Sequence, residues 1–397
     1  MTDPKPVVAA DRLPSEQRVV WAELFFDLIW VFAVTQIATA LTTAPDAAAS
    51  ARTLLLFVPL WWGWVGTTLL ANLAGPRVDR AAGRLVLFGL AGAGLLISVA
   101  VTGAYGDRGL TFAGGYAALR LVLWAAYRRL PVASAAPRVE PFAVAAFVVA
   151  PLFVAGAVVD GPARIALWSV AALIEVAAPR VLRNRLGELR FETAHLPERF
   201  GLFLIIALGE TVVAVGGQAA SLHLDGYRYA ALGLAFAIIM LLWWTYFHFG
   251  APAARYSLEH TSAQARIVTE VFSYAHFGYV VGIIFMAVGL KKLLVHPLAA
   301  PHSVPELLLA PGLALYLLGF CYARWRMFGA ATVHRLTAAL ACVVAAATAP
   351  LLAPLVTAGL LTAILLALNC YEAWLVHTGR PLPLLHRPGR GAVDDRA

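Results

Sequence analysis

The sequence predicts an all-α polytopic membrane protein with about twelve transmembrane helices. Hydrophobic residues make up 61% of the 397 positions and charged residues only 13%, and the mean hydropathy is +0.78. A soluble domain carries roughly 25% charged residues. Apolar segments of about 20 residues, the length of a helix that crosses ~30 Å of hydrocarbon, also recur along the chain. Together these observations exclude a water-soluble fold.

Twelve apolar segments reach this length. The first two expected spans run from Trp21 to Thr43 and from Thr53 to Leu73. The others cover residues 82–104, 110–131, 140–159, 162–181, 196–219, 226–249, 267–290, 305–326, 331–349 and 351–376.

Positive charges alternate between the two sides of the expected membrane. With a cytoplasmic N-terminus, the cytoplasmic side receives 23 of the 30 Lys and Arg residues and the opposite side six, while Arg120 lies inside a span. This asymmetry places both termini in the cytoplasm. The net charge of +8 then reflects basic loops that face membrane lipids, so no nucleic-acid partner is expected.

The chain has the pattern of a duplicated unit. Spans two and eight share a Trp-rich run, Leu60-Trp-Trp-Gly-Trp64 and Leu242-Trp-Trp-Thr-Tyr246, and spans one and seven both place a Glu at the cytoplasmic end. We therefore expect two six-helix halves, related by an axis along the membrane normal because six is even. The expected organisation is a cytoplasmic segment 1–20, a first half 21–181, a linker 182–195, a second half 196–376 and a cytoplasmic tail 377–397.

Two segments resemble the signature stretches of the low temperature requirement A (LtrA) family of bacterial membrane proteins. They are Trp21-Ala-Glu-Leu-Phe-Phe-Asp-Leu-Ile-Trp-Val-Phe-Ala-Val-Thr-Gln36 and His195-Leu-Pro-Glu-Arg-Phe-Gly-Leu-Phe-Leu-Ile-Ile-Ala-Leu-Gly-Glu210. The resemblance covers nearly the whole chain. It implies a multi-pass protein of the bacterial cytoplasmic membrane that is linked to growth in the cold, and it implies no defined molecular activity.

Ionisable residues inside the spans are the candidate functional residues, because a charge near the bilayer centre costs several kcal/mol unless it is paired or hydrated. Glu23 lies within one turn of the cytoplasmic boundary, and Asp27 follows on the same helical face roughly 6 Å deeper. A helix cap is the structural alternative for Glu23, and a buried ion pair is the alternative for Asp27. Both residues are candidate substrate or proton sites.

The seventh span contributes two more acids. Glu198 follows Pro197 in the first helical turn, where a carboxylate complements the helix dipole, so a structural role is the main alternative for Glu198 and its neighbour Arg199. Glu210 lies roughly 18 Å further along the helix, at or just beyond mid-membrane. Its structural alternative is a neutral carboxyl group that is hydrogen-bonded in the core.

Arg120 is the one cation deep within an expected span. We expect it to face the interior and to pair with Asp27, Glu23 or Glu210, because an unpaired guanidinium at mid-membrane costs at least ~2.5 kcal/mol. A purely structural ion pair and the binding of an anionic or carboxylate substrate are both consistent with this position.

His276 lies near the midplane of the ninth span, below a Gly278-x-x-x-Gly282 spacing that favours close helix packing. It is either a hydrogen-bonded core group or a proton carrier. The remaining charged residues lie closer to the cytoplasmic ends and are expected to extend to the interface; they are Glu175, Glu270, His248 and Glu372.

These residues favour a secondary transporter of an unidentified small molecule, proton-coupled through the buried acids, more than an enzyme. The open alternatives are a membrane-embedded enzyme that acts on a lipid-like substrate, a channel, and a nonenzymatic envelope factor for growth in the cold. No nucleotide, metal or nucleophile motif is present, so no cofactor and no metal are expected. A cavity between the halves that contains Asp27, Glu210 and Arg120 would favour transport, whereas a slot open to lipid above clustered acids would favour an enzyme.

Overall fold

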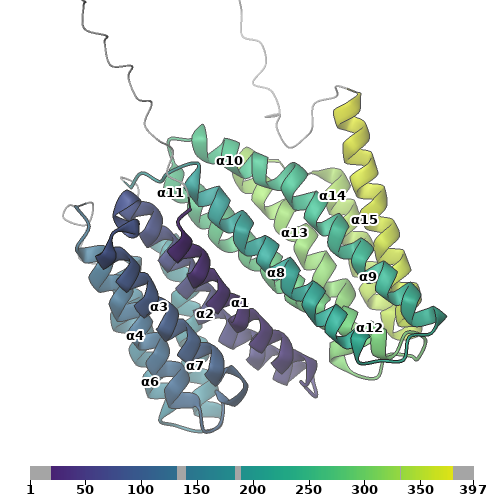
Figure 1. Ribbon diagram of the computed structural model, residues 1–397, viewed down its shortest axis with the longest axis horizontal. Coiled ribbons are helices and arrows are strands. Elements are labelled where there is room, and N and C mark those ends of the chain that lie inside the picture. Colours follow the sequence, from purple (N-terminus) through teal and green to yellow (C-terminus); the bar gives the residue numbers. More distant parts are fainter. Residues whose placement is uncertain (1–18, 132–139, 184–188, 331, 379–397) are drawn as a thin grey trace, which may run out of the picture.

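The computed structural model describes residues 19–131, 140–183, 189–330 and 332–378, and every regular element in these ranges is helical (Figure 1). The first group of helices comprises α1 (Trp21–Thr42), α2 (Ala47–Ala74), α3 (Ala81–Ala100), α4 (Gly109–Arg128), α5 (Pro141–Val144), α6 (Ala150–Ala157) and α7 (Pro162–Val181). The second comprises α8 (His195–Ala220), α9 (Gly226–Trp244), α10 (Ala251–Glu259), α11 (Gln264–Ile267), α12 (His276–Val295), α13 (Leu309–Phe328), α14 (Val333–Thr348) and α15 (Pro354–His377). Three π-helical stretches, η4 (Ala145–Val149), η6 (Thr245–Gly250) and η7 (Val268–Ala275), join α5 to α6, α9 to α10 and α11 to α12.

The expected spans are present as helices. Within the described ranges, ten helical runs are long and apolar enough to cross a membrane. The other two expected spans correspond to the shorter apolar run Pro141–Ala157 and to α13, which ends with Arg324 and Arg326 in its last turns. The chain is therefore an all-α membrane protein, as the composition predicts.

Some helix boundaries differ from the hydropathy limits for local reasons. Helix α2 begins at Ala47, because the Asp46 side chain accepts a hydrogen bond from the backbone N–H of Ala49 at 2.7 Å and caps the helix. The eighth helical run continues from α9 through η6 and α10 to Glu259, ten residues beyond the expected end. Polar residues thus extend the helices past the apolar segments.

The helices form two groups that lie side by side (Figure 1). In the first group α1 packs against α2 and α3, α3 against α4, and α2 against α7. In the second group α8 packs against α9 and α12, α12 against α13, and α9 against α15. Helix α1 crosses between the groups, where it packs against α8 and α12.

Aromatic side chains fill the contact between the groups. Trp61 and Trp64 of α2 are 1% and 0% exposed, and the Trp64 ring lies 4.3 Å from the Phe203 ring of α8, centroid to centroid. The Trp61 indole N–H donates to the Ser273 carbonyl at 2.9 Å. The first Trp-rich run is therefore core packing between the groups.

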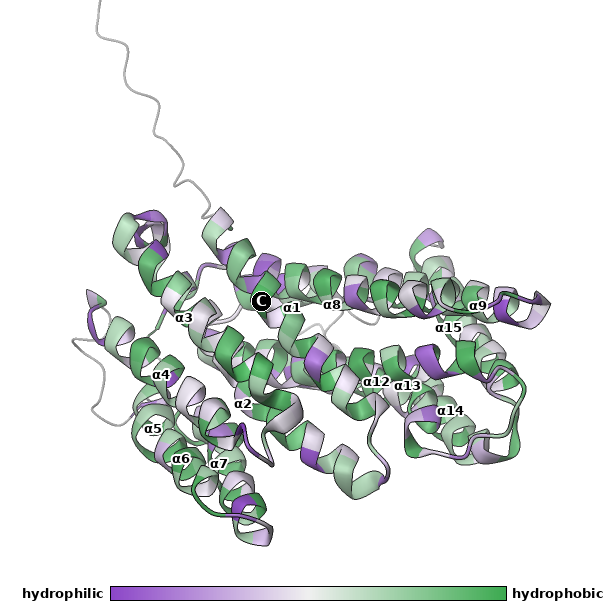
Figure 2. Ribbon diagram, turned by 60° about the horizontal axis from the view of Figure 1, so that its bottom comes forward, coloured by the Kyte–Doolittle hydropathy of each residue, from purple (hydrophilic) through white to green (hydrophobic). Residues whose placement is uncertain are grey.

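The helices are hydrophobic along most of their length (Figure 2), and large apolar side chains also lie on the outer surface. Large hydrophobic side chains such as Leu28, Val213 and Phe236 are 59%, 66% and 64% exposed. A soluble protein rarely exposes extended apolar surface of this kind. Lipid contact accounts for it, in agreement with the length of the helices.

One helix crossing is made possible by glycine. A Cβ atom on Gly282 of α12 would lie 2.7 Å from the Gly312 carbonyl oxygen of α13, and a Cβ atom on Gly312 would lie 2.7 Å from the Gly282 oxygen. Any larger residue would force α12 and α13 apart. Gly278, the other member of the predicted glycine pair, has no such close contact, because a Cβ there would be 4.0 Å from its nearest neighbour.

Candidate charge network and cavity

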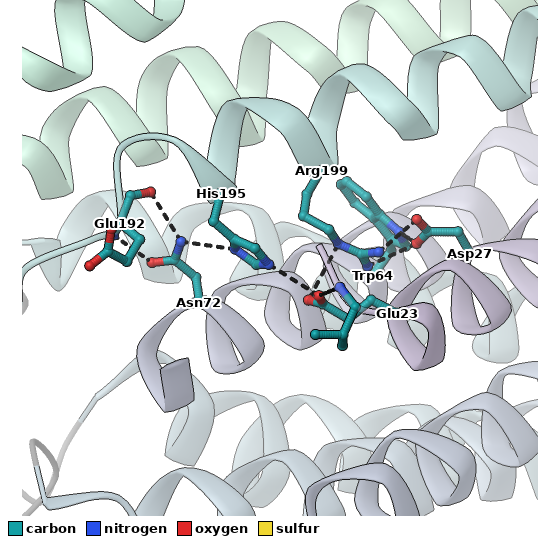
Figure 3. Close-up of polar contacts among 8 residues, drawn as sticks. Glu23, Asp27, Trp64, Asn72, Glu192, His195 and Arg199 are labelled. Atoms are coloured by element: carbon teal, nitrogen blue, oxygen red, sulfur yellow. Dashed lines mark hydrogen bonds and ion pairs between the residues drawn. The ribbon is translucent and has the colours of Figure 1, made fainter. Parts of the chain in front are cut away.

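A fully buried ion pair joins α1 to α8. Arg199 Nη1 and Nη2 donate to Asp27 Oδ2 and Oδ1 at 2.8 and 2.9 Å, and neither side chain is exposed to solvent (Figure 3). The Trp64 indole N–H from α2 also donates to Asp27 Oδ1, at 2.8 Å. Three helices from two groups therefore meet at one carboxylate.

A second polar chain continues from this pair toward the start of α1. His195 Nε2 lies 3.1 Å from Glu23 Oε2, and its Nδ1 lies 3.2 Å from the Asn72 amide nitrogen. That amide also donates to the Glu192 carbonyl at 3.2 Å, and Asn72 Oδ1 accepts from the Glu192 N–H at 3.0 Å (Figure 3). If Asn72 donates to His195 Nδ1, the imidazole proton is on Nε2 and is donated to Glu23.

Glu23 serves both as a helix cap and as part of the network. Its Oε2 accepts a hydrogen bond from the Val20 N–H at 3.0 Å, which is the structural role that its position suggests. Its Oε1 has no hydrogen-bond partner among the described residues and lies 3.6 Å from Arg199 Nε, too far for a hydrogen bond. Glu23 therefore keeps a buried, unoccupied acceptor beside a guanidinium.

The network has more acid than base. It contains the carboxyl groups of Glu23 and Asp27 and the single guanidinium of Arg199, all unexposed. Among the described residues, the only other titratable group in contact with it is His195, which is also unexposed. A proton on His195 or on one carboxyl would bring the described network to neutrality, which suits a site that gains and loses a proton.

The predicted partners of Arg120 are wrong. Arg120 is 3% exposed and faces the interior as expected, but it pairs with Glu175 of α7. Its Nε also donates to the Tyr116 hydroxyl at 3.0 Å, and that hydroxyl donates to Glu175. Asp27 and Glu23 instead contact Arg199 and His195 of α8. Helices α4 and α7 both pack against α2, and the Arg120–Glu175 pair between them lies within the first group.

A cavity of about 70 Å³ lies beside the Arg120–Glu175 pair. Its walls come from α2, α4, α5, η4, α7 and, from the second group, α11 and η7; its other lining is mostly apolar and includes Trp62, Gly66, Phe142, Val149 and Val268. The cavity thus lies between the groups and contains Arg120, but it contains neither Asp27 nor Glu210.

The remaining predicted site residues lie apart from the cavity. Glu210 is partly exposed on the outer side of α8, near the exposed Val212 and Val213, and makes no hydrogen bond among the described residues. Glu198 is exposed and lines an open groove of about 680 Å³ between α8 and α10. The structure therefore brings Glu23 and Asp27 together and leaves Glu198 and Glu210 separate.

His276 is enclosed by aromatic rings. Its Nδ1 lies 2.9 Å from the Val271 carbonyl, to which only an N–H can donate, and its Nε2 lies 2.8 Å from the Tyr246 hydroxyl. The ring is 2% exposed. This geometry is that of a hydrogen-bonded core histidine, the structural alternative for this position.

The expectation that the acids near the cytoplasmic ends extend to the interface is wrong. Glu175, Glu270 and Glu372 are 3%, 0% and 0% exposed. Arg180, Arg183 and Arg326 all lie within 3.5 Å of Glu270, and Arg335 contacts Glu372 at 2.6 Å. Each acid is thus an internal ion-pair partner that hydropathy alone does not reveal.

No group of three or more His, Cys, Asp or Glu side chains in the described ranges is arranged to hold a metal ion. The site is instead a set of buried ion pairs between and within two helix groups of a polytopic α-helical membrane protein.

Comparison with known proteins identifies the family. The chain belongs to the bacterial low temperature requirement A protein (LtrA) family, whose profile matches residues 18–370. It is 32% identical over 296 residues to an uncharacterized protein of Rhizobium meliloti (strain 1021), and the alignment covers 71% of each chain. No solved structure matches this chain.

Proposed function

We propose that the protein is a secondary transporter of a small molecule, coupled to protons through the charge network that Glu23, Asp27, His195 and Arg199 form. We further propose that it lies in the bacterial cytoplasmic membrane with both termini in the cytoplasm, because that orientation places 23 of the 30 basic residues on the inner side. The observation that carries the proposal is the unexposed Arg199–Asp27 pair between α1 and α8.

An ion pair at this place links the state of charge to the contact between the groups. Truncating one partner of a buried pair costs ~3–5 kcal/mol, because the other charge stays buried without compensation. Protonation of Asp27 removes most of the electrostatic attraction to Arg199. It therefore shifts the balance between closed and separated arrangements of α1 and α8, as proton coupling requires.

Helix α2 connects this network to the cavity. Trp64 and Asn72 donate to the network, whereas Trp62 and Gly66 line the cavity. A rotation or shift of α2 that breaks the first set of contacts also changes the cavity wall. The cavity is the proposed substrate site.

The dimensions and lining of the cavity indicate the substrate class. A water molecule needs about 10–15 Å³ of such volume, so about 70 Å³ holds a few waters or a compact solute. Among the described residues that line it, Arg120 is the only cationic side chain and Glu175 the only acidic one. An apolar solute with one carboxylate or other hydrogen-bond acceptor fits best, because that group can replace Glu175 as the binding partner of Arg120.

We also propose that the two helix groups are an internal repeat. Equivalent helix pairs are in contact in both groups. In the first group α1 contacts α2 and α3, α3 contacts α4, and α2 contacts α7. In the second group α8 contacts α9 and α12, α12 contacts α13, and α9 contacts α15. Glu175 and Glu372 also occupy the last helix of each group, and each binds an arginine of its own group. An axis along the membrane normal is the arrangement expected for six helices per half.

The test is untargeted uptake and efflux profiling of a deletion strain at low temperature, complemented with the wild type, Asp27→Asn or Glu175→Gln. Wild-type complementation should change the level of at least one small molecule, and both variants should lose that change while reaching the membrane in equal amounts. The Arg84→Gln variant is the matched control, because it removes an arginine whose ion pair with Asp79 is exposed. Identical profiles for wild type and deletion strain would contradict transport.

The open groove between α8 and α10 favours a second candidate, an enzyme that acts on a lipid-like substrate. It is the larger hollow, about 680 Å³, and Glu198 and Arg255 line it. Among the described residues it contains a single carboxylate, which is fewer than the acid and base pair that such chemistry commonly uses. A change in lipid composition in the deletion strain that the wild type reverses, and that Glu198→Gln alone among the variants fails to reverse, would favour this alternative.

A further inference from the structure

The start of α14 carries buried cationic groups that are not fully satisfied. Arg324 of α13 is 4% exposed, and its Nε and Nη1 atoms are buried without a hydrogen-bond partner in the described ranges. Arg335 of α14 is unexposed and uses Nε and Nη2 to bind Glu372 at 2.6 and 2.8 Å. Its Nη1 is also buried and has no hydrogen-bond partner among the described residues. Buried guanidinium nitrogens without partners are costly, and native proteins rarely leave them so.

The charge around these atoms is positive. Arg324 and Arg335 lie close enough for their like charges to interact. Glu372 is the only carboxylate that contacts either of them in the described structure, and His334 shares it at 3.0 Å. Glu372 therefore contacts Arg335 and His334, and no carboxylate in the described structure contacts Arg324.

The helix terminus adds to this positive potential. Helix α14 has no acidic residue in its first turn, which instead contains His334 and Arg335, the reverse of what the helix dipole favours. Thr332 occupies the N-cap but makes no capping hydrogen bond, and its buried hydroxyl has no partner among the described residues. Backbone N–H groups, the hydroxyl and the guanidinium nitrogens are all donors, so the missing component is an acceptor.

We propose that Arg324, Arg335 and Thr332, at the start of α14, form a binding site for a phosphate group. A phosphate supplies several negatively charged acceptor oxygens and suits the planar donor arrangement of arginine. It offsets the excess positive charge and satisfies donors that the protein leaves free. This site is separate from the proposed substrate cavity, whose lining contains none of these residues.

Two sources can supply this phosphate group, an anionic phospholipid headgroup or a soluble phosphate. The outer face of α14 favours the lipid, since Val333, Leu336 and Leu340 are 77%, 38% and 55% exposed and continue from the site along the helix. Acyl chains could lie against this face while the headgroup occupies the site. The experiment therefore tests the lipid and the soluble ion separately.

Binding is measured on the purified full-length protein in nanodiscs of phosphatidylcholine. One arm adds short-chain phosphatidylglycerol and the other adds inorganic phosphate, and native mass spectrometry or a thermal shift reports occupancy. We expect Arg324→Gln to weaken binding in the responding arm by about tenfold or more, since it removes charge-assisted hydrogen bonds. Thr332→Val, a milder change that keeps both arginines, should weaken it in the same direction.

Arg84→Gln is the matched control, because this exposed arginine lies outside the site, and it should bind like the wild type. A response to phosphatidylglycerol alone assigns the site to lipid, and a response to both assigns it to phosphate in general. The proposal is overturned if neither probe binds, or if Arg324→Gln and Thr332→Val both bind as the wild type does. Either result leaves the transport assay above unaffected.

Discussion

Replacement of Arg199 by Ala is expected to destabilise the fold strongly. The guanidinium makes two hydrogen bonds to Asp27 and lies 3.6 Å from Glu23, and none of the three side chains is exposed. Its removal leaves two buried acids whose only remaining side-chain partners among the described residues are Trp64 and His195. Loss of one partner from a buried pair costs ~3–5 kcal/mol.

The Asp27→Asn variant should cost less, because the amide oxygen still accepts from Trp64 and Glu23 still offsets the arginine. The combined Arg199→Ala, Asp27→Asn variant should then be more stable than the sum of the two single effects predicts, with a coupling of about 0.5–3 kcal/mol. The measurement is equilibrium unfolding in mixed detergent micelles for the wild type, both single variants and the double variant.

A control distinguishes burial from charge. Arg84 and Asp79 form a pair at the same 2.8 Å, but their side chains are 51% and 55% exposed. Arg84→Ala should change the free energy of unfolding by only about 0–1 kcal/mol. If Arg199→Ala costs no more than Arg84→Ala, or if the double variant is additive within about 0.5 kcal/mol, the Arg199–Asp27 pair does not stabilise the contact as argued.

The Arg120–Glu175 pair, the buried Glu140 and the partly exposed Glu210 each give a further prediction. Arg120→Ala should lower the free energy of unfolding by ~3–5 kcal/mol. The double variant Arg120→Gln, Glu175→Gln should lower it by less than the sum of the Arg120→Gln and Glu175→Gln effects in the same unfolding assay, and additive effects would argue against the Arg120–Glu175 pair. Burial raises the pKa of Glu140 from 4.5 to about 7, although hydrogen bonds from two backbone N–H groups act to lower it. Between these two pKa values the folded protein keeps a proton that the unfolded chain releases. The free energy of unfolding should therefore fall by at most about 3 kcal/mol as the pH rises from 4.5 to about 7. Glu140→Gln should remove that fall, and a variant with the same pH dependence of unfolding as the wild type would refute the prediction. Glu210 is partly exposed on the outer side of α8, so a lipid-soluble carbodiimide should modify it in preference to the buried acids, as peptide mass spectrometry would show, and equal labelling of Glu210→Gln would contradict this.

The transmembrane segments could be predicted because hydrophobicity is a local property of the sequence. Segment lengths located the long apolar helices, whose ends shifted where residues such as Asp46 cap a helix beyond the apolar stretch. The short helices α10 and α11, between two of these segments, were not predicted. The membrane itself imposes this simple rule, since every backbone polar group in lipid must be bonded within a helix.

The ion-pair partners could not be predicted from depth and charge alone. Arg120 and Arg199 both lie where they could neutralise Asp27, and only the packing of α7 and α8 assigns one to Glu175 and the other to Asp27. One sequence signal did exist. Glu23 and Asp27 are four residues apart, as are His195 and Arg199, so two acids on one helix face match two bases on another.

The most direct test of the central claim measures proton movement through the charge network. The wild type and Asp27→Asn are reconstituted in liposomes that contain a pH-sensitive dye, and the solutes that the profiling identifies are added outside. We expect the wild type to move protons together with the solute, and Asp27→Asn to remain folded and inserted but to move none, because an amide cannot exchange the proton. Solute-driven proton movement in Asp27→Asn at the wild-type rate would contradict the assignment of Asp27 as the coupling group.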